Sequence, residues 1–453
     1  MKEKRLKGST KCRRTRFVKT ALGISVMLVS GPSFAHQIYK GSHFDATINT
    51  TLYEGIQYGT GLNYGAGVNG DKQRTNLESA IEPDLNLSWT QGQSTFYGEL
   101  SIIGAGTGGD GSLGGNSFTA AGDTGFETEQ AHVGWRYKDI DLSAGAQDFT
   151  VGDGFIISDG NFDTGATTGE YWITPHTAWR NSAILRVNTK PLRGDAFYLK
   201  AGKSWGYPEL AGGDVAYTLP GDTGTLGAMY FNIFKDQYDR FGVYPYAGMD
   251  VYTIRAHGIQ FPFLPNMKFY SEYAHQGGKV EGTDLTRDAN AWYFEGAYQF
   301  KKVRWTPELT YRYSHFSGAK QGQNAALDYQ GLFYFTSARG WDTWYQGEIA
   351  GEYQLFNENQ NTQMVKLKAY PNDQWDVALI YFNNQLDQPQ YYGQPLTSTD
   401  WSNEVNLEAE YYPTKNLYIL GLVGWAAPGA AAKQVYGSGQ DFTVAEAYLQ
   451  YTF

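Results

Sequence analysis

The chain has 453 residues, of which 18% are charged and 16% aromatic, with 55 glycines, 15 prolines and one cysteine. Nine of the 36 lysines and arginines and one of the 46 acidic residues lie within residues 1–35, so residues 36–453 carry a formal charge near −18. This acidity argues against nucleic acid and anionic lipid surfaces as partners. Because the cysteine is Cys12, residues 36–453 hold no disulfide framework and no thiolate metal site.

Residues 1–35 have the pattern of a secretory signal peptide. A basic stretch precedes an apolar run at 21–29, and the small-x-small pattern SFA follows at 33–35. We expect cleavage after Ala35 through the general secretion route, since the residues after Arg13-Arg14 are out of step with a twin-arginine signal. No linker or helical repeat interrupts residues 36–453, which we expect to form a single domain.

The remainder of the chain is dominated by period-two alternation of apolar and polar residues, which is the signature of β-strands. We count eighteen strands from 46–59 to 443–453. The alternation is clear in "DLNLSWT" (84–90), "TFYGELSI" (95–102), "YQGEIAGEYQL" (345–355) and "NEVNLEAEYY" (403–412). Short turns such as "KDID" (138–141) separate longer Gly, Asp and Thr-rich loops such as 104–125 and 150–170.

The strand count is open at two places. Short turns follow even-numbered strands near the N-terminus, but "FLPN" (263–266) and "FKK" (300–302) follow odd-numbered ones. A strand is therefore missed or misassigned between 205 and 250, and a second break in phase lies in 315–343. Closure favours an even number, so sixteen or twenty strands remain possible.

The alternation and the absence of a long apolar segment together define the fold class. The longest mainly apolar run after the leader, 417–432, is too short and too interrupted by Gly and Pro to span a bilayer as a helix. Strands with one apolar and one charged face satisfy their edges in a membrane by closing into a ring. We predict an all-β fold, a transmembrane antiparallel up-and-down β-barrel in the outer membrane of a Gram-negative bacterium. A soluble sandwich or propeller is the alternative.

The last strand supplies a candidate assembly signal. Steps of two back from Phe453 give Tyr451, Leu449, Ala447 and Ala445, an apolar face that ends on an aromatic ring. "AYLQYTF" resembles the terminal signal that barrel-assembly machinery recognises. We therefore expect Phe453 and Tyr451 to face lipid and to direct assembly, with the assembly machinery and outer-membrane lipid as partners.

Two stretches carry a resemblance to a known family. "GAQDFTVGDGFIISDGNFD" (145–163) and "WDTWYQGEIAGEYQLFNENQNTQMVKLKAYPNDQWDVALIYF" (341–382) are similar to alginate export porins. The resemblance implies a monomeric barrel with a charged, loop-gated lumen that passes an anionic polysaccharide or related solute. The acid excess departs from that expectation, and no arginine of the family is carried over.

If the apolar faces contact lipid, the opposite faces line the lumen with charges of both signs. We expect inward basic groups at Arg136, Lys138, Arg180, Arg186, Lys200, Arg255, Arg304, Arg312, Lys366 and Lys368. We expect inward acids at Glu99, Glu272, Glu295, Glu308, Glu348, Glu352, Glu404, Glu408 and Glu410. Opposed charged walls suit a solute channel. For any one residue, the alternative is that it only pairs with an opposite charge on a neighbouring strand and keeps the lumen hydrated. The basic groups cluster at 136–200 and the acids at 348–410, which predicts one positive and one negative wall.

Two loop motifs suggest other chemistry. Asp159, Asn161, Asp163 and Glu170 occupy positions 1, 3, 5 and 12 of a calcium-loop spacing without its glycine, so we expect either a structural calcium site or a plain solvated loop. "GAGTGG" (104–109) matches a nucleotide-binding pattern, but no helix follows and we interpret it as an external loop. No serine motif or paired acids indicate catalysis.

We predict a porin that passes a hydrophilic solute, a saccharide or an anionic uronate-type polysaccharide, by facilitated diffusion or export. No cofactor other than the calcium is expected, and no enzymatic step. Residues 315–343 are the candidate constriction, because a long aromatic loop is hard to explain outside the barrel. The alternatives are a plugged barrel that serves adhesion or binding and, third, a barrel enzyme.

Overall fold

The computed structural model describes residues 36–62, 72–116, 118–162, 168–173, 175–237, 245–334, 339–340, 344 and 346–453. The predicted signal peptide at 1–35 therefore lies outside the described residues. None of the helices in the described part is long and apolar enough to cross a membrane. The strands are β1 His36–Lys40, β2 Phe44–Thr60, β3 Gln73–Gln91, β4 Ser94–Gly109, β5 Thr124–Tyr137, β6 Ile140–Gln147, β7 Trp179–Thr189, β8 Leu192–Lys200, β9 Glu209–Thr218, β10 Thr225–Lys235, β11 Met249–Phe261, β12 Leu264–Lys279, β13 Thr286–Gln299, β14 Glu308–Phe316, β15 Gln360–Asn372, β16 Trp375–Leu386, β17 Gln390–Tyr391, β18 Gln394–Pro395, β19 Asp400–Thr414, β20 Leu417–Pro428 and β21 Phe442–Thr452.

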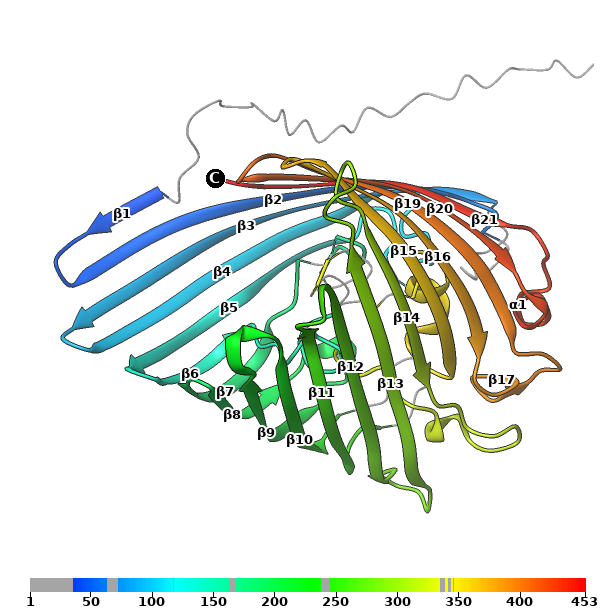
Figure 1. The fold of residues 1–453 in the computed structure, drawn as a ribbon, viewed down its shortest axis with the longest axis horizontal. Helices are drawn as coiled ribbons and strands as arrows, with labels where there is room; N and C mark the ends of the chain where they lie inside the picture. The colour runs from blue at the N-terminus through cyan, green and yellow to red at the C-terminus, as the bar shows by residue number, and fades with distance from the viewer. Residues whose placement is uncertain are drawn as a thin grey trace, which may run out of the picture. The chain divides into compact units, whose positions relative to one another are not determined.

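Eighteen of these strands form a closed ring. Each strand from β2 to β16 pairs antiparallel with the next, β16 pairs with β19, and β19 continues to β20 and β21. β21 then pairs with β2 over Thr51–Thr60, which closes the ring (Figure 1). β1 pairs with Asp45–Ile48, farther along the same edge of β2. The predicted antiparallel barrel of eighteen strands is confirmed.

Short and long connections lie at opposite ends of the barrel. The short turns, at 92–93, 138–139, 190–191, 219–224, 262–263, 300–307, 373–374 and 415–416, follow every second strand of the ring. The connections at the other end include 110–123, 148–178, 317–359, 387–399 and 429–441, the last of which carries helix α1 Ala430–Tyr436. Short turns on one side and long loops on the other are typical of outer-membrane barrels, in which the short turns face the periplasm.

The two breaks in strand phase have structural explanations. Between 205 and 250 the structure has two strands, β9 and β10, joined at 219–224, so one strand was indeed missed. The expected strand at 345–355 is wrong: it belongs to the connection 317–359, and Gly351–Leu355 form a short π-helix. The sequence analysis thus missed one strand and counted one too many, so its total of eighteen equals the number of strands in the ring. "GAGTGG" was also misplaced, because β4 runs through to Gly109.

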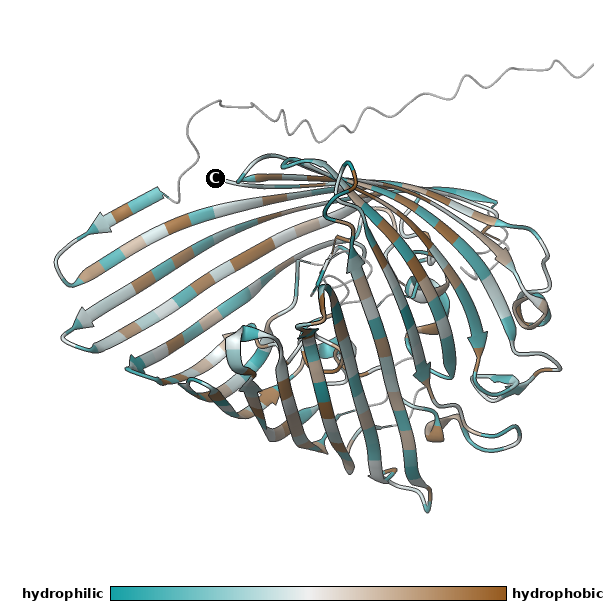
Figure 2. Cartoon of the chain, in the orientation of Figure 1, coloured by the Kyte–Doolittle hydropathy of each residue, from teal (hydrophilic) through white to brown (hydrophobic). Residues whose placement is uncertain are grey.

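The strand faces alternate as the sequence predicts, and Figure 2 shows bands of brown and teal along the strands. Outward apolar side chains such as Val133, Ile254 and Leu407 are 56–68% exposed. Aromatic pairs stack on this face near the short turns, including Trp89 with Phe96, Trp375 with Tyr411 and Tyr451 with Phe453. A closed barrel with an apolar outer face and an aromatic girdle is an outer-membrane barrel.

Phe453 lies at the seam. Its backbone N–H donates to Thr50 O at 2.9 Å, and Thr50 N–H donates to Phe453 O at 2.8 Å. Tyr451 lies two residues earlier, at an outward position of β21, and its ring stacks on that of Phe453 with centroids 5.7 Å apart. The expectation that both rings face lipid agrees with these positions, whereas their role as an assembly signal stays a prediction.

Candidate functional site

Two long connections fold into the lumen. We name residues 148–178 the first inward loop and residues 317–359 the second inward loop. Apolar side chains of both pack in one buried cluster with inward residues of the wall, including Phe155 and Phe333 from the loops and Phe231 from β10. The loops also pair with each other, since Phe333 N–H donates to Ile156 O at 3.1 Å and Phe333 O accepts from Ser158 N–H at 2.9 Å. The described part of the predicted constriction segment, including Leu332 and Phe333, thus packs against inward residues of the barrel wall.

A wall carboxylate binds the first inward loop through its backbone. Glu78, an inward residue of β3, accepts hydrogen bonds from the backbone N–H groups of Tyr171, Trp172 and Ile173 at 3.1, 2.7 and 3.0 Å. All four residues are buried, with Glu78 only 1% exposed. A buried carboxylate that accepts several N–H bonds offsets part of its desolvation cost, so Glu78 fixes this loop to the wall.

A second wall carboxylate, Glu129 of β5, fixes the end of the same loop. It accepts from the backbone N–H of Thr177 at 2.7 Å and of Ala178 at 2.5 Å, and Arg180 Nη1 lies 3.1 Å from its Oε2. His176 Nδ1 lies 3.3 Å from the same oxygen. Burial alone would lower the pKa of His176, but the hydrogen bond to Glu129 and the charge of Glu170 raise it to about 9. His176 is therefore a cation at neutral pH.

The second inward loop is held by the same device. Glu404 of β19 is fully buried and accepts from the backbone N–H of Ile349 at 3.0 Å and of Ala350 at 2.9 Å. Predicted pore acids Glu348 and Glu352 belong to this loop rather than to a strand, and both are buried. Glu404, Glu348 and Glu352 are thus placed at the contact between loop and wall, not on an open lumenal surface.

A charged network crosses the lumen where the two loops meet. Arg339 of the second loop lies 2.8 Å from Asp153 of the first loop and 2.7 Å from Glu295 of β13. Tyr293 donates its hydroxyl to Asp153 at 2.7 Å. Burial alone would lower the pKa of Arg339, but the carboxylates of Glu295 and Asp153 raise it. Arg339 stays charged and bridges the loops to the wall.

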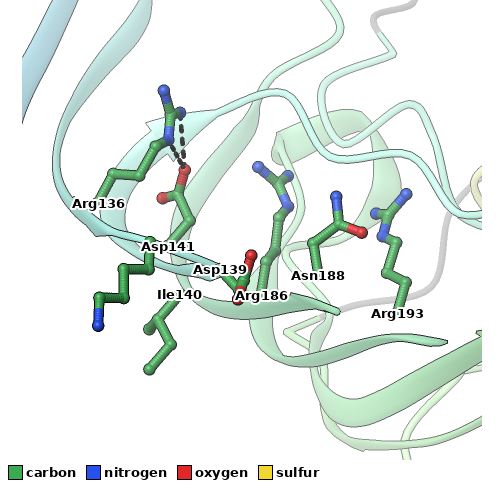
Figure 3. A pocket seen from close by; sticks show the side chains of 8 residues that line it. Arg136, Asp139, Ile140, Asp141, Arg186, Asn188 and Arg193 are labelled. Atoms are coloured by element: carbon green, nitrogen blue, oxygen red, sulfur yellow. Dashed lines mark hydrogen bonds and ion pairs between the residues drawn. The ribbon is translucent and has the colours of Figure 1, made fainter. Parts of the chain in front are cut away.

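A cavity of about 430 Å³ opens inside the barrel near the short turns. It is lined by Arg136, Lys138, Asp139, Ile140, Asp141, Arg186, Asn188 and Arg193. We name it the basic pocket, since four of its eight lining residues are basic and two are acidic. Two of its arginines, Arg136 and Arg186, come from the predicted basic cluster. Figure 3 shows Arg186, Asn188 and Arg193 side by side and pointing the same way.

The arginines of the basic pocket differ in their partners. Arg136 is paired with Asp141, whose Oδ2 lies 2.7 Å from Nη2 and 2.9 Å from Nε (Figure 3). Arg193 lies 2.6 Å from Asp195. Arg186 packs over the Phe149 ring at 5.3 Å, and among the described residues it makes no hydrogen bond or ion pair. Its charge is therefore available to a solute.

An acidic region lies near the short turns of a different arc. Lys368 of β15 is 2.8 Å from Asp376 and 2.5 Å from Glu410, and its register partner across the strands is Glu308. Three acids thus surround one lysine on strands β14 to β19. One positive and one negative wall stay a prediction, and Glu404 and the loop acids do not contribute to a negative one.

The other predicted pore residues divide by position. Arg180, Arg255, Arg312, Lys366, Glu99, Glu272, Glu295 and Glu408 occupy inward strand positions. Arg255 is committed to Asp214, with two contacts of 2.7 Å. Lys138 and Arg304 lie in short turns.

Lys200 is placed differently from the expectation that it lines the pore. On β8, Asp195, Phe197 and Leu199 are buried inside, so Lys200 belongs to the outward set. It lies 3.4 Å from Glu209, an acid that also pairs with Lys235 at 2.7 Å. This group is at the loop end of the outer face, and we leave Lys200 out of the proposed pore.

The described members of the tentative calcium set lie in the first inward loop rather than in an external one. Asp159 accepts from the backbone N–H of Asn161 at 2.9 Å, and burial raises the pKa of Asp159 well above its usual value. Asn161 donates to Glu129 at 3.2 Å, and Glu170 lies 3.8 Å from His176. Asp163 lies outside the described residues. Calcium binding here stays a prediction.

Several residues of the site were not predicted. Glu78, Glu129, Arg193, His176 and Arg339 were absent from the candidate set. Arg193 lies in "KPLRGD" (190–195), a sequence typical of a turn, although β8 begins at Leu192. The other four act by contacts between segments far apart in the chain, and only the burial of their charge in the folded barrel reveals them.

Comparison with known proteins supports the fold. No protein-family model and no curated protein matches the chain. Among solved structures it is similar to a BenF-like porin from Pseudomonas fluorescens Pf-5, with 10% identity, a TM-score of 0.61 and coverage of 90% of this chain and 98% of that one. It is also similar to OccAB2 of Acinetobacter baumannii (11%, TM-score 0.58, 90% and 98%) and OccK2 (OpdF) of Pseudomonas aeruginosa (12%, 0.58, 90% and 97%). The specific resemblance to alginate export porins is not supported.

Proposed function

We propose that this barrel is a porin that passes a hydrophilic anionic solute, a uronate-type saccharide, by diffusion and without a covalent step. The observation that carries the proposal is Arg186, whose charge faces the lumen without a carboxylate partner beside Asn188 and Arg193. A guanidinium recognises a carboxylate through paired N–H donors, and the neighbouring amide can bond sugar hydroxyls. The porin fold of the solved structures is consistent with a channel.

We expect weak ion selectivity, because an acidic region lies on the opposite arc. A mouth with a basic region on β5 to β8 and an acidic one on β14 to β19 carries a transverse field rather than a net charge. Small anions can pass along the basic side of the mouth and small cations along the acidic side. A uronate oligomer has both carboxylates and hydroxyls, so it gains more from the basic pocket than a monovalent ion does.

Single-channel conductance with uronate oligomers tests the proposal. We expect block in the unmodified protein, weakened about tenfold by Arg186→Gln, since this variant loses a charge-assisted hydrogen bond to the solute. Arg304→Gln is the control, because Arg304 lies in a short turn over the Trp305 ring. Arg180 is not replaced, since it holds Glu129. Strong cation selectivity without uronate block would exclude an anionic solute.

A plugged barrel that binds a partner is the second candidate. The observation in its favour is that side chains of both inward loops fill two apolar clusters inside the ring. Stable channel openings in a planar bilayer exclude a permanent plug, whereas a silent barrel that becomes conductive only when residues 317–359 are shortened supports one.

A further inference from the structure

Three carboxylates from two parts of the chain meet inside the barrel, away from the basic pocket. Glu348 and Glu352 come from the second inward loop and Glu446 from β21. Each offers one oxygen, and these three oxygens all lie within 4.8 Å of one another. The three residues are at most 6% exposed.

Glu352 gives an independent reason to expect a ligand here. It is 1% exposed, yet neither of its carboxylate oxygens has a hydrogen-bond partner. Oε2 of Glu446 is likewise buried without a partner. Among the residues that the structure describes, no basic group forms an ion pair with Glu352 or Glu446. A buried carboxylate left without donor or countercharge is strongly unfavourable, so these groups must either take up protons or bind a cation.

The spacing and the donor type indicate the class of ligand. Calcium binds oxygen at roughly 2.3–2.6 Å, so two oxygens on one ion are at most about 5 Å apart. The 4.8 Å limit of the cluster satisfies that condition. The ligands are carboxylates with no sulfur or imidazole, which favours a hard cation over a transition metal. Gln57 donates to Oε1 of Glu446 at 2.7 Å and fixes the orientation of that carboxylate.

We propose that Glu348, Glu352 and Glu446 bind a divalent hard cation, calcium in preference to magnesium, that ties the second inward loop to strand β21. Magnesium demands a tighter octahedral shell and keeps its waters, which the buried position disfavours. The cation adds a second attachment beside Glu404, which already holds Ile349 and Ala350. The inference does not depend on which solute the barrel passes.

Calcium binding by the full, folded barrel tests the proposal. Asp159→Asn serves as the background, so that the predicted site in the first loop does not contribute. After treatment with a chelator, calorimetric titration with calcium chloride should show one site per chain, weakened tenfold or more by Glu352→Gln and by Glu446→Gln. Glu82→Gln is the matched control, because this inward acid of β3 accepts a hydrogen bond from the Tyr53 hydroxyl at 2.9 Å and is not a member of the three-carboxylate cluster.

Protease cleavage within 317–359 gives a second readout. Calcium should slow it in the background chain and leave it unchanged in Glu352→Gln. The proposal is overturned if the background chain binds no calcium, or if both variants bind as tightly as the background. If Glu352→Gln fails to assemble, calcium binding by Glu446→Gln tests the proposal instead. Glu446 lies on a strand, and the glutamine that replaces it has the same shape as the glutamate.

Discussion

Replacement of Glu78 by alanine should release the first inward loop without opening the barrel. The carboxylate accepts three backbone N–H bonds, from Tyr171, Trp172 and Ile173. Hydrogen bonds to a charged group contribute roughly 1.5–3 kcal/mol each. Relaxation of the loop and recovery of the desolvation cost of Glu78 reduce the sum, and we expect a loss of about 3–5 kcal/mol in the free energy that opposes local opening.

Hydrogen exchange measures this loss directly. Amides of 171–173 should exchange at least about 100-fold faster in Glu78→Ala, since each 1.4 kcal/mol corresponds to about a factor of ten. The barrel should still migrate as a compact species in unheated detergent gels. Glu82→Gln, on the same face of β3, is the control. Unchanged exchange at 171–173 in an assembled Glu78→Ala barrel would refute the role of Glu78.

Three further predictions follow from the seam and the first loop. Deletion of Phe453 or Phe453→Asp should sharply reduce outer-membrane assembly, and normal abundance with heat-modifiable mobility would contradict the signal. Calcium should protect 150–170 from protease and Asp159→Ala should abolish the protection, whereas cleavage indifferent to chelator leaves no site there. Since the pKa of His176 is raised from 6.5 to about 9, its roughly 3 kcal/mol of stabilisation is fully present below pH 6.5 and lost as pH rises through 9. Protease sensitivity of the loop should rise there, and His176→Gln should remove the step.

The ring of strands could be predicted because a strand between lipid and water must alternate along its whole length. The face of an individual residue was less secure, and β5 shows why. A β-bulge opposite Leu100 and Ile102 shifts its register, so that Glu127 and Glu129 face inward together with His132 and Arg136. One extra residue reverses the alternation, and no local signal in the sequence marks it.

Residues 346–355 show the opposite failure. Their alternation resembles a strand, yet they belong to a loop, because a loop inside a barrel also has two environments. Glu352 meets the carboxylate of Glu446 on the wall, while Tyr353 packs in the apolar cluster with Tyr171 of the first loop. Period two reports two environments, and it does not report that one of them is lipid.

The acid excess that argued against an anionic solute has another explanation in the folded barrel. Glu78, Glu129 and Glu404 accept hydrogen bonds from backbone N–H groups of the inward loops, and Asp214 and Asp195 are paired with arginines. These acids are buried, and the groups that contact them offset their charges. They therefore contribute little to the electrostatic field that a solute meets. The basic pocket at the mouth keeps an arginine that no acid pairs with, among the described residues. The net charge of the chain therefore includes many buried acids that only hold the inward loops in place. The local arrangement of arginines at the mouth determines which solutes are attracted there.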